Sequence, residues 1–205
     1  MDGGNTPDFR TLPVPRDDGA CDHLPGSRVP SVRLASTAGG WADVAEIAAS
    51  PAVLFFYPRT GEPGRPAGPA WDAIPGARGC TPQSCGFRDL HGQFLARGVA
   101  VYGVSTQETG YQRAFVERNH VPFEMLSDRD LALIRALRLP TFEYPVEGGG
   151  PTTLIKRMAW FVDRGRIERI WYPVFPPDRN AETVLGWLRE RERILVGDHS
   201  RSGLA

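Results

Sequence analysis

The sequence predicts an α/β protein in which helices flank a central mixed β-sheet. Short apolar runs of strand length alternate along the chain with segments whose apolar residues recur at helical spacing. Near the C-terminus two such runs follow each other across a tight turn, which adds an antiparallel hairpin to the alternating order. With 205 residues, of which 41% are hydrophobic, the chain is long enough for one domain with a sizeable core.

The first part of the chain contains an arm, a buried strand and an insertion. Residues 1–24 are rich in Pro, Gly, Asp and Arg and predict an extended arm. The weakly alternating segment 31–35 predicts a strand, and 42–49 predicts a short helix. Residues 52–57 read Ala-Val-Leu-Phe-Phe-Tyr, which is typical of a strand buried on both faces. Segment 59–79 contains four prolines and many glycines, so we expect a long, stiff loop inserted in the domain.

The middle of the chain continues the alternation of helices and strands. Apolar residues at helical spacing predict a helix over 81–97, with Pro82 in its first turn, where proline is tolerated. Residues 99–105, Val-Ala-Val-Tyr-Gly-Val-Ser, predict a second buried strand. We expect a further helix over 109–119 and a short strand over 123–126.

The next helix is expected over 131–137. Ser127 is placed to cap it, and the negative charge of Asp130 favours its start. The glycine-rich segment 144–153 that follows predicts a loop.

The C-terminal part completes the predicted sheet. Residues 158–163 and 167–171 predict a hairpin that turns at Arg164-Gly165. An amphipathic pattern predicts a last helix over 181–195, and we expect 196–205 to be a mobile tail. The domain itself is therefore expected over 25–195.

The most informative stretch is the start of the helix over 81–97, which reads GCTPQSCGFRD from Gly79 to Asp89. It places Cys80 and Cys85, two of only three cysteines, five positions apart at a helix N-terminus. Thiols at such a place feel unpaired backbone N–H groups and the positive end of the helix dipole, which favour the thiolate. The pattern therefore predicts a redox site.

Composition excludes several other classes of protein. Lys+Arg and Asp+Glu are both 24, so a net charge of +0 gives no support for a nucleic-acid or anionic-membrane partner. The longest apolar runs are too short to span a bilayer, and the N-terminal residues lack the apolar stretch of a secretory signal. Three cysteines are too few for a disulfide scaffold, and we expect a cytoplasmic protein.

The cysteines and histidines also have purely structural interpretations. The cysteine pair could be two small buried hydrophobes. Cys21, which lies in the arm, is either incidental or an auxiliary thiol. The four histidines do not share a metal-binding spacing with the cysteines, so we expect neither a metal site nor a cofactor. These histidines are His23, His91, His120 and His199.

Three motifs together carry a family resemblance. A strand ends in Phe-Tyr-Pro, a Gly-Cys-Thr with a second cysteine precedes Phe-Arg-Asp, and an arginine lies six residues before an aspartate that ends a strand. The corresponding residues are Phe56-Tyr57-Pro58, Gly79-Cys80-Thr81, Cys85, Phe87-Arg88-Asp89 and Arg157 with Asp163. Together they resemble peroxiredoxins of the bacterioferritin-comigratory or Q-type branch.

The resemblance implies a thioredoxin-like fold and a thiol peroxidase with a peroxide substrate. Cys80 is then the peroxidatic cysteine, Cys85 is the resolving cysteine, and Arg157 stabilises both the thiolate and the peroxide. The reductant is implied to be thioredoxin or another thiol, and the protein to be a monomer or weak dimer. Cysteines five apart on a regular helix lie too far apart for a disulfide, so we expect the helix to unwind locally on oxidation.

One departure from the family pattern affects the peroxide site. The family holds a threonine three residues before the reactive cysteine, where this chain has Ala77. Peroxide affinity therefore depends on another group, and Thr60 is a candidate. The missing hydroxyl supports an alternative function, a redox sensor or thiol-disulfide exchange module. A binding protein without catalysis on the same scaffold is a third alternative.

Overall fold

The computed structural model describes residues 7–61, 64, 68–144 and 152–202. A seven-stranded mixed sheet with the order β2-β1-β5-β4-β3-β8-β9 forms its centre. Strands β3, β4 and β5 are parallel, and β1, β8 and β9 are antiparallel to their neighbours. The strands are β1 (Arg33–Ser36), β2 (Trp41–Asp43), β3 (Ala52–Phe56), β4 (Ala100–Ser105), β5 (Met125–Ser127), β8 (Met158–Asp163) and β9 (Arg166–Trp171).

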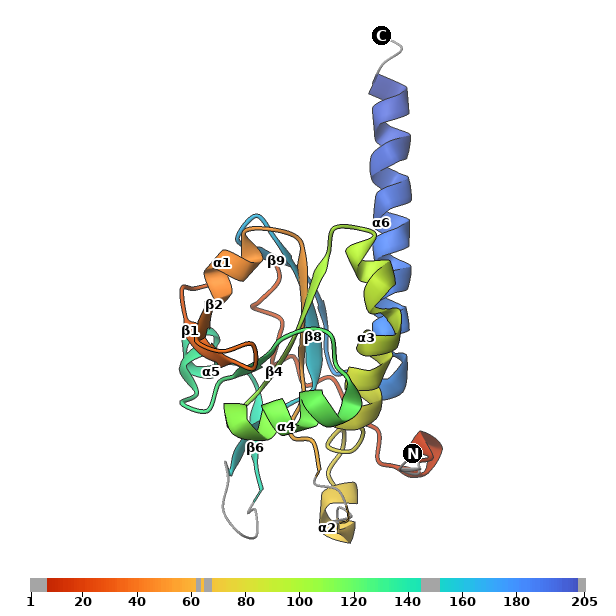
Figure 1. The fold of residues 1–205 in the computed structure, drawn as a ribbon. Coiled ribbons are helices and arrows are strands. Elements are labelled where there is room, and N and C mark those ends of the chain that lie inside the picture. The colour runs from red at the N-terminus through yellow and green to blue at the C-terminus, as the bar shows by residue number, and fades with distance from the viewer. Residues whose placement is uncertain (1–6, 62–63, 65–67, 145–151, 203–205) are drawn as a thin grey trace.

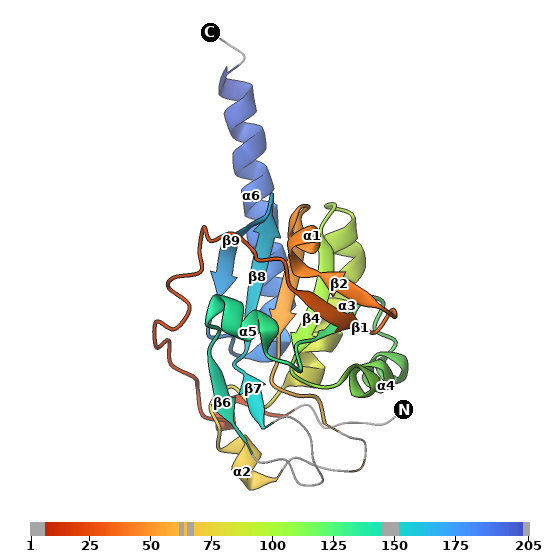
Figure 2. The ribbon, with the colours of Figure 1, turned by 90° about the vertical axis from the view of Figure 1, so that its left-hand side faces the viewer.

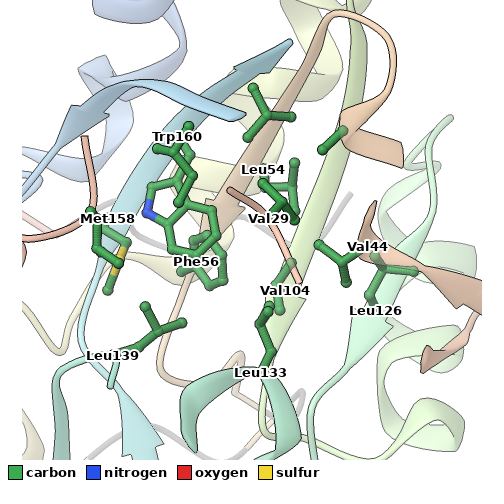
Figure 3. Packing of buried hydrophobic residues seen from close by; sticks show 14 of the residues in the cluster. Val29, Val44, Leu54, Phe56, Val104, Leu126, Leu133, Leu139, Met158 and Trp160 are labelled. Carbon is green, nitrogen blue, oxygen red and sulfur yellow. The ribbon is translucent and has the colours of Figure 1, made fainter. Parts of the chain in front are cut away.

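Strand β3 divides the interior into two hydrophobic cores. All five of its residues are buried, as the continuous apolar run predicts. Side chains alternate across the sheet, so Leu54 and Phe56 enter one core while Val53 and Phe55 enter the other. Figure 3 shows the first core, in which Phe56 packs on Trp160 of β8 with ring centroids 4.3 Å apart.

Helices cover both faces of the sheet (Figure 1). The face with Phe55 is covered by α3 (Cys80–Leu95), α4 (Thr109–Asn119) and α6 (Asn180–Ser202). The opposite face is covered by α1 (Val44–Ala48), α5 (Ala132–Leu137) and the N-terminal arm. The predicted α/β sandwich with a central mixed sheet is therefore confirmed, together with the hairpin at Arg164-Gly165.

Two local predictions differ from the structure. Ser127 does not cap α5: the carboxylate of Asp128 accepts the backbone N–H groups of Leu133 and Ile134 instead. Ser127 donates its hydroxyl to the Gln107 carbonyl. The described part of the arm contains a short 3₁₀ helix, η1 (Phe9–Thr11), and its Phe9 and Leu24 are buried, so it packs on the domain.

Two further differences concern elements that the sequence pattern did not indicate. The predicted loop over 59–79 contains a one-turn helix, α2 (Pro69–Asp72). A separate two-stranded sheet consists of β6 (Thr141–Glu143) and β7 (Thr153–Ile155), which flank the predicted loop. Most of that loop, 145–151, lies outside the described residues. Figure 2 shows α2 next to the β6–β7 pair at one end of the molecule.

The last helix is longer than predicted. Helix α6 begins after a second 3₁₀ turn, η2 (Pro177–Arg179), and continues to Ser202, beyond the expected end at Leu195. Its Val184 and Leu185 are buried on the α3 side, as the amphipathic pattern predicts. The expected mobility of the tail stays a prediction, and 203–205 lie outside the described residues. None of the helices in the described part of the chain is long and apolar enough to cross a membrane.

Gly103 on β4 offers a test of the close packing under α3. A Cβ added there would lie 2.9 Å from Phe55 Cζ and would overlap the sulfur of Met125. We expect Gly103→Ala to lower the free energy of unfolding in urea by about 1–3 kcal/mol because overpacked cores must shift. The control is Gly110→Ala in α4, where a Cβ meets nothing within 4 Å. Equal effects of the two substitutions would contradict the tight packing.

Candidate active site

Cys80 is the first residue of α3 and lies at the junction of helix, arm and C-terminal region. The preceding Gly79 has a φ of +104°, a conformation that side chains rarely adopt, and acts as the N-cap without a capping side chain. A Cβ at Gly79 would lie 2.8 Å from the Phe9 ring and would overlap Pro177 of η2. Phe9 and Pro177 therefore pack closely against the residue before Cys80, and Cys80 itself is buried.

Arg157 comes directly before β8, and the structure brings it to Cys80. Its Nη2 atom lies 3.1 Å from the Cys80 Sγ atom. The guanidinium is buried, with a relative exposure of 3%. At this distance a cation attracts a negatively charged sulfur strongly, because little water intervenes. The structure therefore places Arg157 beside the sulfur of Cys80, where the family resemblance implies it.

Three consecutive carbonyl groups of the insertion hold the guanidinium. Nε of Arg157 donates to the Gly76 carbonyl at 3.2 Å, and Nη2 donates to the carbonyls of Ala77 and Arg78 at 3.0 and 3.2 Å. The Cys80 thiol also lies 3.7 Å from the Ala77 carbonyl. The end of the insertion therefore forms one wall of the site.

A buried amide pair completes the surroundings of Arg157. Nη1 donates to Oε1 of Gln83, whose Nε2 donates to Oδ1 of Asn180 at 2.9 Å. Both amides are buried. Gln83 lies three residues after Cys80, on the same face of the helix, so its spacing could have indicated it. Asn180 begins α6 far away in the sequence and gives no local signal.

Cys85 is half-buried on the same helix, and all three cysteines are free thiols. Burial raises its pKa, partly offset by the positive charge of Arg88. Because α3 is regular from Cys80 onward, the Cα atoms of the two cysteines lie roughly 8–9 Å apart by helix geometry. A disulfide needs about 4.4–6.8 Å, so it cannot form in this conformation.

Cys21 lies elsewhere, in the core on the opposite face of the sheet, where its sulfur contacts Met158 Sδ at 4.0 Å. Burial, followed by the charges of Asp18 and Asp17, raises its pKa to about 12. Its thiol is therefore protonated and packs as a small hydrophobe, in line with the incidental alternative.

Neither Ala77 nor Thr60 replaces the hydroxyl that the family pattern places near the reactive cysteine. The side chain of Ala77 is fully buried in a small cluster with Trp71 and Leu154, while its carbonyl faces the site. Thr60 donates its hydroxyl to Oε1 of Gln107 at 3.2 Å, and its carbonyl accepts the hydroxyl of Tyr111. The Thr60 hydroxyl is thus engaged by Gln107 rather than by the sulfur of Cys80.

Comparison with protein families identifies the arrangement. A family model described as Redoxin matches residues 24–185. The chain belongs to the Redoxin family. It is 26% identical over 165 residues to the chloroplastic peroxiredoxin Q of Gentiana triflora, covering 80% of this chain and 66% of that protein. It is 29% identical over 164 residues to the putative peroxiredoxin bcp of Coxiella burnetii, covering 80% of this chain and 97% of that protein. The predicted resemblance to the Q/bcp branch is confirmed.

Solved structures show the same fold as this Redoxin-family chain. Peroxidoxin BcpB from Mycobacterium tuberculosis superposes with a TM-score of 0.63 at 24% identity, covering 82% of this chain and 97% of that chain. Peroxiredoxin Q from Xanthomonas campestris superposes with a TM-score of 0.60 at 22% identity, covering 87% and 97%. The thioredoxin-like fold is therefore confirmed.

The raised pKa values predict slow alkylation of Cys85 and Cys21. A raised pKa means less thiolate at a given pH, and only the thiolate reacts. At pH 8 a thiol with a pKa of about 12 is ionised in roughly one molecule in ten thousand. We expect iodoacetamide to label Cys85 more slowly in the folded protein than in urea, and Cys21 only in urea. Peptide mass spectrometry reads each site, and equal rates in folded and unfolded protein would contradict the burial.

Ala77→Thr tests whether the family's hydroxyl can be restored at this position. Because the Ala77 methyl faces Trp71 and Leu154, a threonine there points into an apolar cluster. We expect a loss of about 1–3 kcal/mol in stability from overpacking and no gain in reactivity with peroxide. Ala77→Val is the matched control, since it has the same shape without the hydroxyl. A faster reaction of the threonine variant than of the valine variant would contradict this placement.

Proposed function

We propose that this chain is a thiol peroxidase that reduces hydrogen peroxide and organic hydroperoxides through Cys80. The observation that carries the proposal is the 3.1 Å approach of Arg157 Nη2 to Cys80 Sγ at the start of α3. A cation and free helix N–H groups stabilise negative charge at one sulfur. The same groups can also stabilise negative charge that develops on a peroxide oxygen during attack.

In the first step the Cys80 thiolate attacks one oxygen of the peroxide. The sulfur–oxygen bond forms as the oxygen–oxygen bond breaks, so that Cys80 is oxidised to a sulfenic acid. The other oxygen leaves as hydroxide or alkoxide, which takes up a proton to give water or an alcohol. Arg157 remains protonated throughout and supplies donors in a fixed fork.

In the second step Cys85 resolves the sulfenic acid. Its sulfur attacks Cys80, a disulfide forms and water leaves. Because a regular helix keeps the two cysteines too far apart, the first turns of α3 must unwind for this step. Gly86, directly after Cys85, makes the opening less costly because glycine is a poor helix former.

A thiol reductant returns the disulfide to two thiols in the proposed cycle. Thioredoxin is the candidate, with small thiols as the alternative. This recycling requires a reducing compartment, such as a cytoplasm. We also propose that the protein acts as a monomer or weak dimer, and one chain suffices for the cycle because it supplies Cys80, Cys85 and Arg157.

One observation favours a second candidate, a redox sensor. The residues described near Cys80 include no threonine hydroxyl in the family's position, since Ala77 presents only its carbonyl. A sensor would oxidise at Cys80 with a rate close to that of an ordinary thiol. The rate of peroxide reaction therefore separates the two candidates.

Stopped-flow tryptophan fluorescence with hydrogen peroxide tests the proposed cycle. Trp71 shares a buried cluster with Ala77, three residues before Cys80, and is positioned to report changes at the start of α3. We expect a fast phase that Cys80→Ser abolishes and a slower phase that Cys85→Ser abolishes. Arg157→Ala should slow the fast phase about 10²–10³-fold, as for other lost oxyanion donors. The control is Cys21→Ser, which should retain both phases. Slow oxidation that is indifferent to Cys80 would rule out the peroxidase.

A further inference from the structure

The insertion carries a tryptophan that packs across two segments leading to the site. Trp71 of α2 is buried, with a relative exposure of 5%. Its ring meets Tyr144 edge-on, with centroids 5.0 Å apart, and Phe142 of β6 at 6.1 Å. The guanidinium carbon of Arg59 lies over the same Trp71 ring, 5.9 Å from its centroid. Figure 2 shows how α2 reaches the β6–β7 pair.

Two backbone hydrogen bonds between nearby residues connect Trp71 with the carbonyl groups that hold Arg157. The N–H of Ile74 donates to the Trp71 carbonyl at 3.2 Å, and the N–H of Ala77 donates to the Ile74 carbonyl at 3.1 Å. An ion pair between Asp72 and Arg78 at 3.0 Å spans the same turns. The position of the Ala77 carbonyl therefore depends on where Trp71 is held.

The other side of the cluster leads to Arg157 itself. Leu154 of β7 is fully buried in the cluster with Trp71 and Ala77, and it lies three residues before Arg157. Trp71 thus packs between the segment that provides the acceptors and the segment that provides the guanidinium. This arrangement fixes the two segments relative to each other.

The guanidinium of Arg157 is oriented by neutral acceptors rather than by an oppositely charged side chain. Within the described ranges, no carboxylate forms an ion pair with Arg157, and its other acceptor is the side-chain amide of Gln83. Neutral acceptors orient the guanidinium without neutralising its charge, which stays available to the sulfur of Cys80. Such a cation depends on the exact position of each acceptor, because there is no stronger partner to hold it.

We propose that Trp71 is a positioning residue that holds the carbonyl groups of 76–78 against Arg157 and so keeps the guanidinium on Cys80. The inference rests on the proposed peroxidase function and assigns the insertion a role in it. Misplacing a positioned group by about 1 Å can lower a rate by about 10²-fold. The insertion is then a working part of the site rather than a passive loop.

A double-mutant cycle between Trp71 and Arg157 tests the inference. The rate of sulfenic acid formation at Cys80 with hydrogen peroxide is followed by rapid quenching, trapping with dimedone and mass spectrometry, because Trp71 is itself a fluorophore. We expect Trp71→Ala to lower this rate about tenfold and Trp71→Phe, which keeps an aromatic ring, to stay within about twofold. In the Arg157→Ala background, Trp71→Ala should change the rate by less than about twofold, since its effect passes through Arg157.

The pH profile of Cys80 alkylation is the second measurement. If the guanidinium moves away, the profile of Trp71→Ala should shift to higher pH, as it should for Arg157→Ala. Trp41→Ala is the matched control, because Trp41 is 60% exposed on β2 and belongs to none of the three core clusters. It should change neither the rate nor the profile.

The outcomes separate failure of this inference from failure of the function. An unchanged rate in folded Trp71→Ala, or an equal loss in the Arg157→Ala background, would overturn the positioning role alone. A peroxide reaction that survives Cys80→Ser would overturn the proposed function itself.

If circular dichroism shows that Trp71→Ala is unfolded, Phe142→Ala takes its place. This substitution removes one ring contact of Trp71 from a half-buried position. An unchanged rate there would equally overturn the inference.

Discussion

The structure around the site depends on a buried cation whose acceptors, among the residues that the structure describes, are all neutral. A guanidinium taken out of water must have its N–H donors satisfied, and an unpaired one is strongly destabilising. Arg157 meets this requirement with three backbone carbonyls and the Gln83 amide. A carboxylate partner would hold it more firmly but would cancel its field. Neutral acceptors leave the charge of the guanidinium uncancelled beside the Cys80 sulfur.

This requirement explains why distant parts of the chain meet at the start of α3. The insertion brings the carbonyls of 76–78, α3 brings Gln83, and α6 begins with Asn180, which fixes the Gln83 amide. Phe9 and Pro177 close over Gly79, where only a glycine fits. Each contribution is small alone, but loss of the Gly76 carbonyl or of the Gln83 amide would leave Nε or Nη1 of Arg157 without the acceptor that the structure gives it. The insertion and the last helix are therefore coupled through Arg157 and Gln83, while the arm packs on the glycine that precedes Cys80.

The sequence predicted the elements whose signals are local. The continuous apolar run of β3, the hairpin at Arg164-Gly165 and the cysteines at the start of α3 all lie within short windows. It could not predict the Gln83–Asn180 pair, because nothing in the sequence connects residues 97 positions apart. The one-turn helix α2 was missed because its prolines and glycines resemble a loop until Trp71 is seen to be buried.

The two steps of the proposed cycle require opposite conformations at the start of α3. The contact between Arg157 and Gln83 requires the first turns of α3 to stay helical. Disulfide formation with Cys85 requires those turns to unwind, which withdraws Gln83 from both Arg157 and Asn180. The carbonyls of the insertion do not belong to the helix, so they can hold Arg157 while α3 opens. In the proposed cycle the insertion carbonyls can therefore keep Arg157 in position for the next reduced state after Gln83 has been withdrawn.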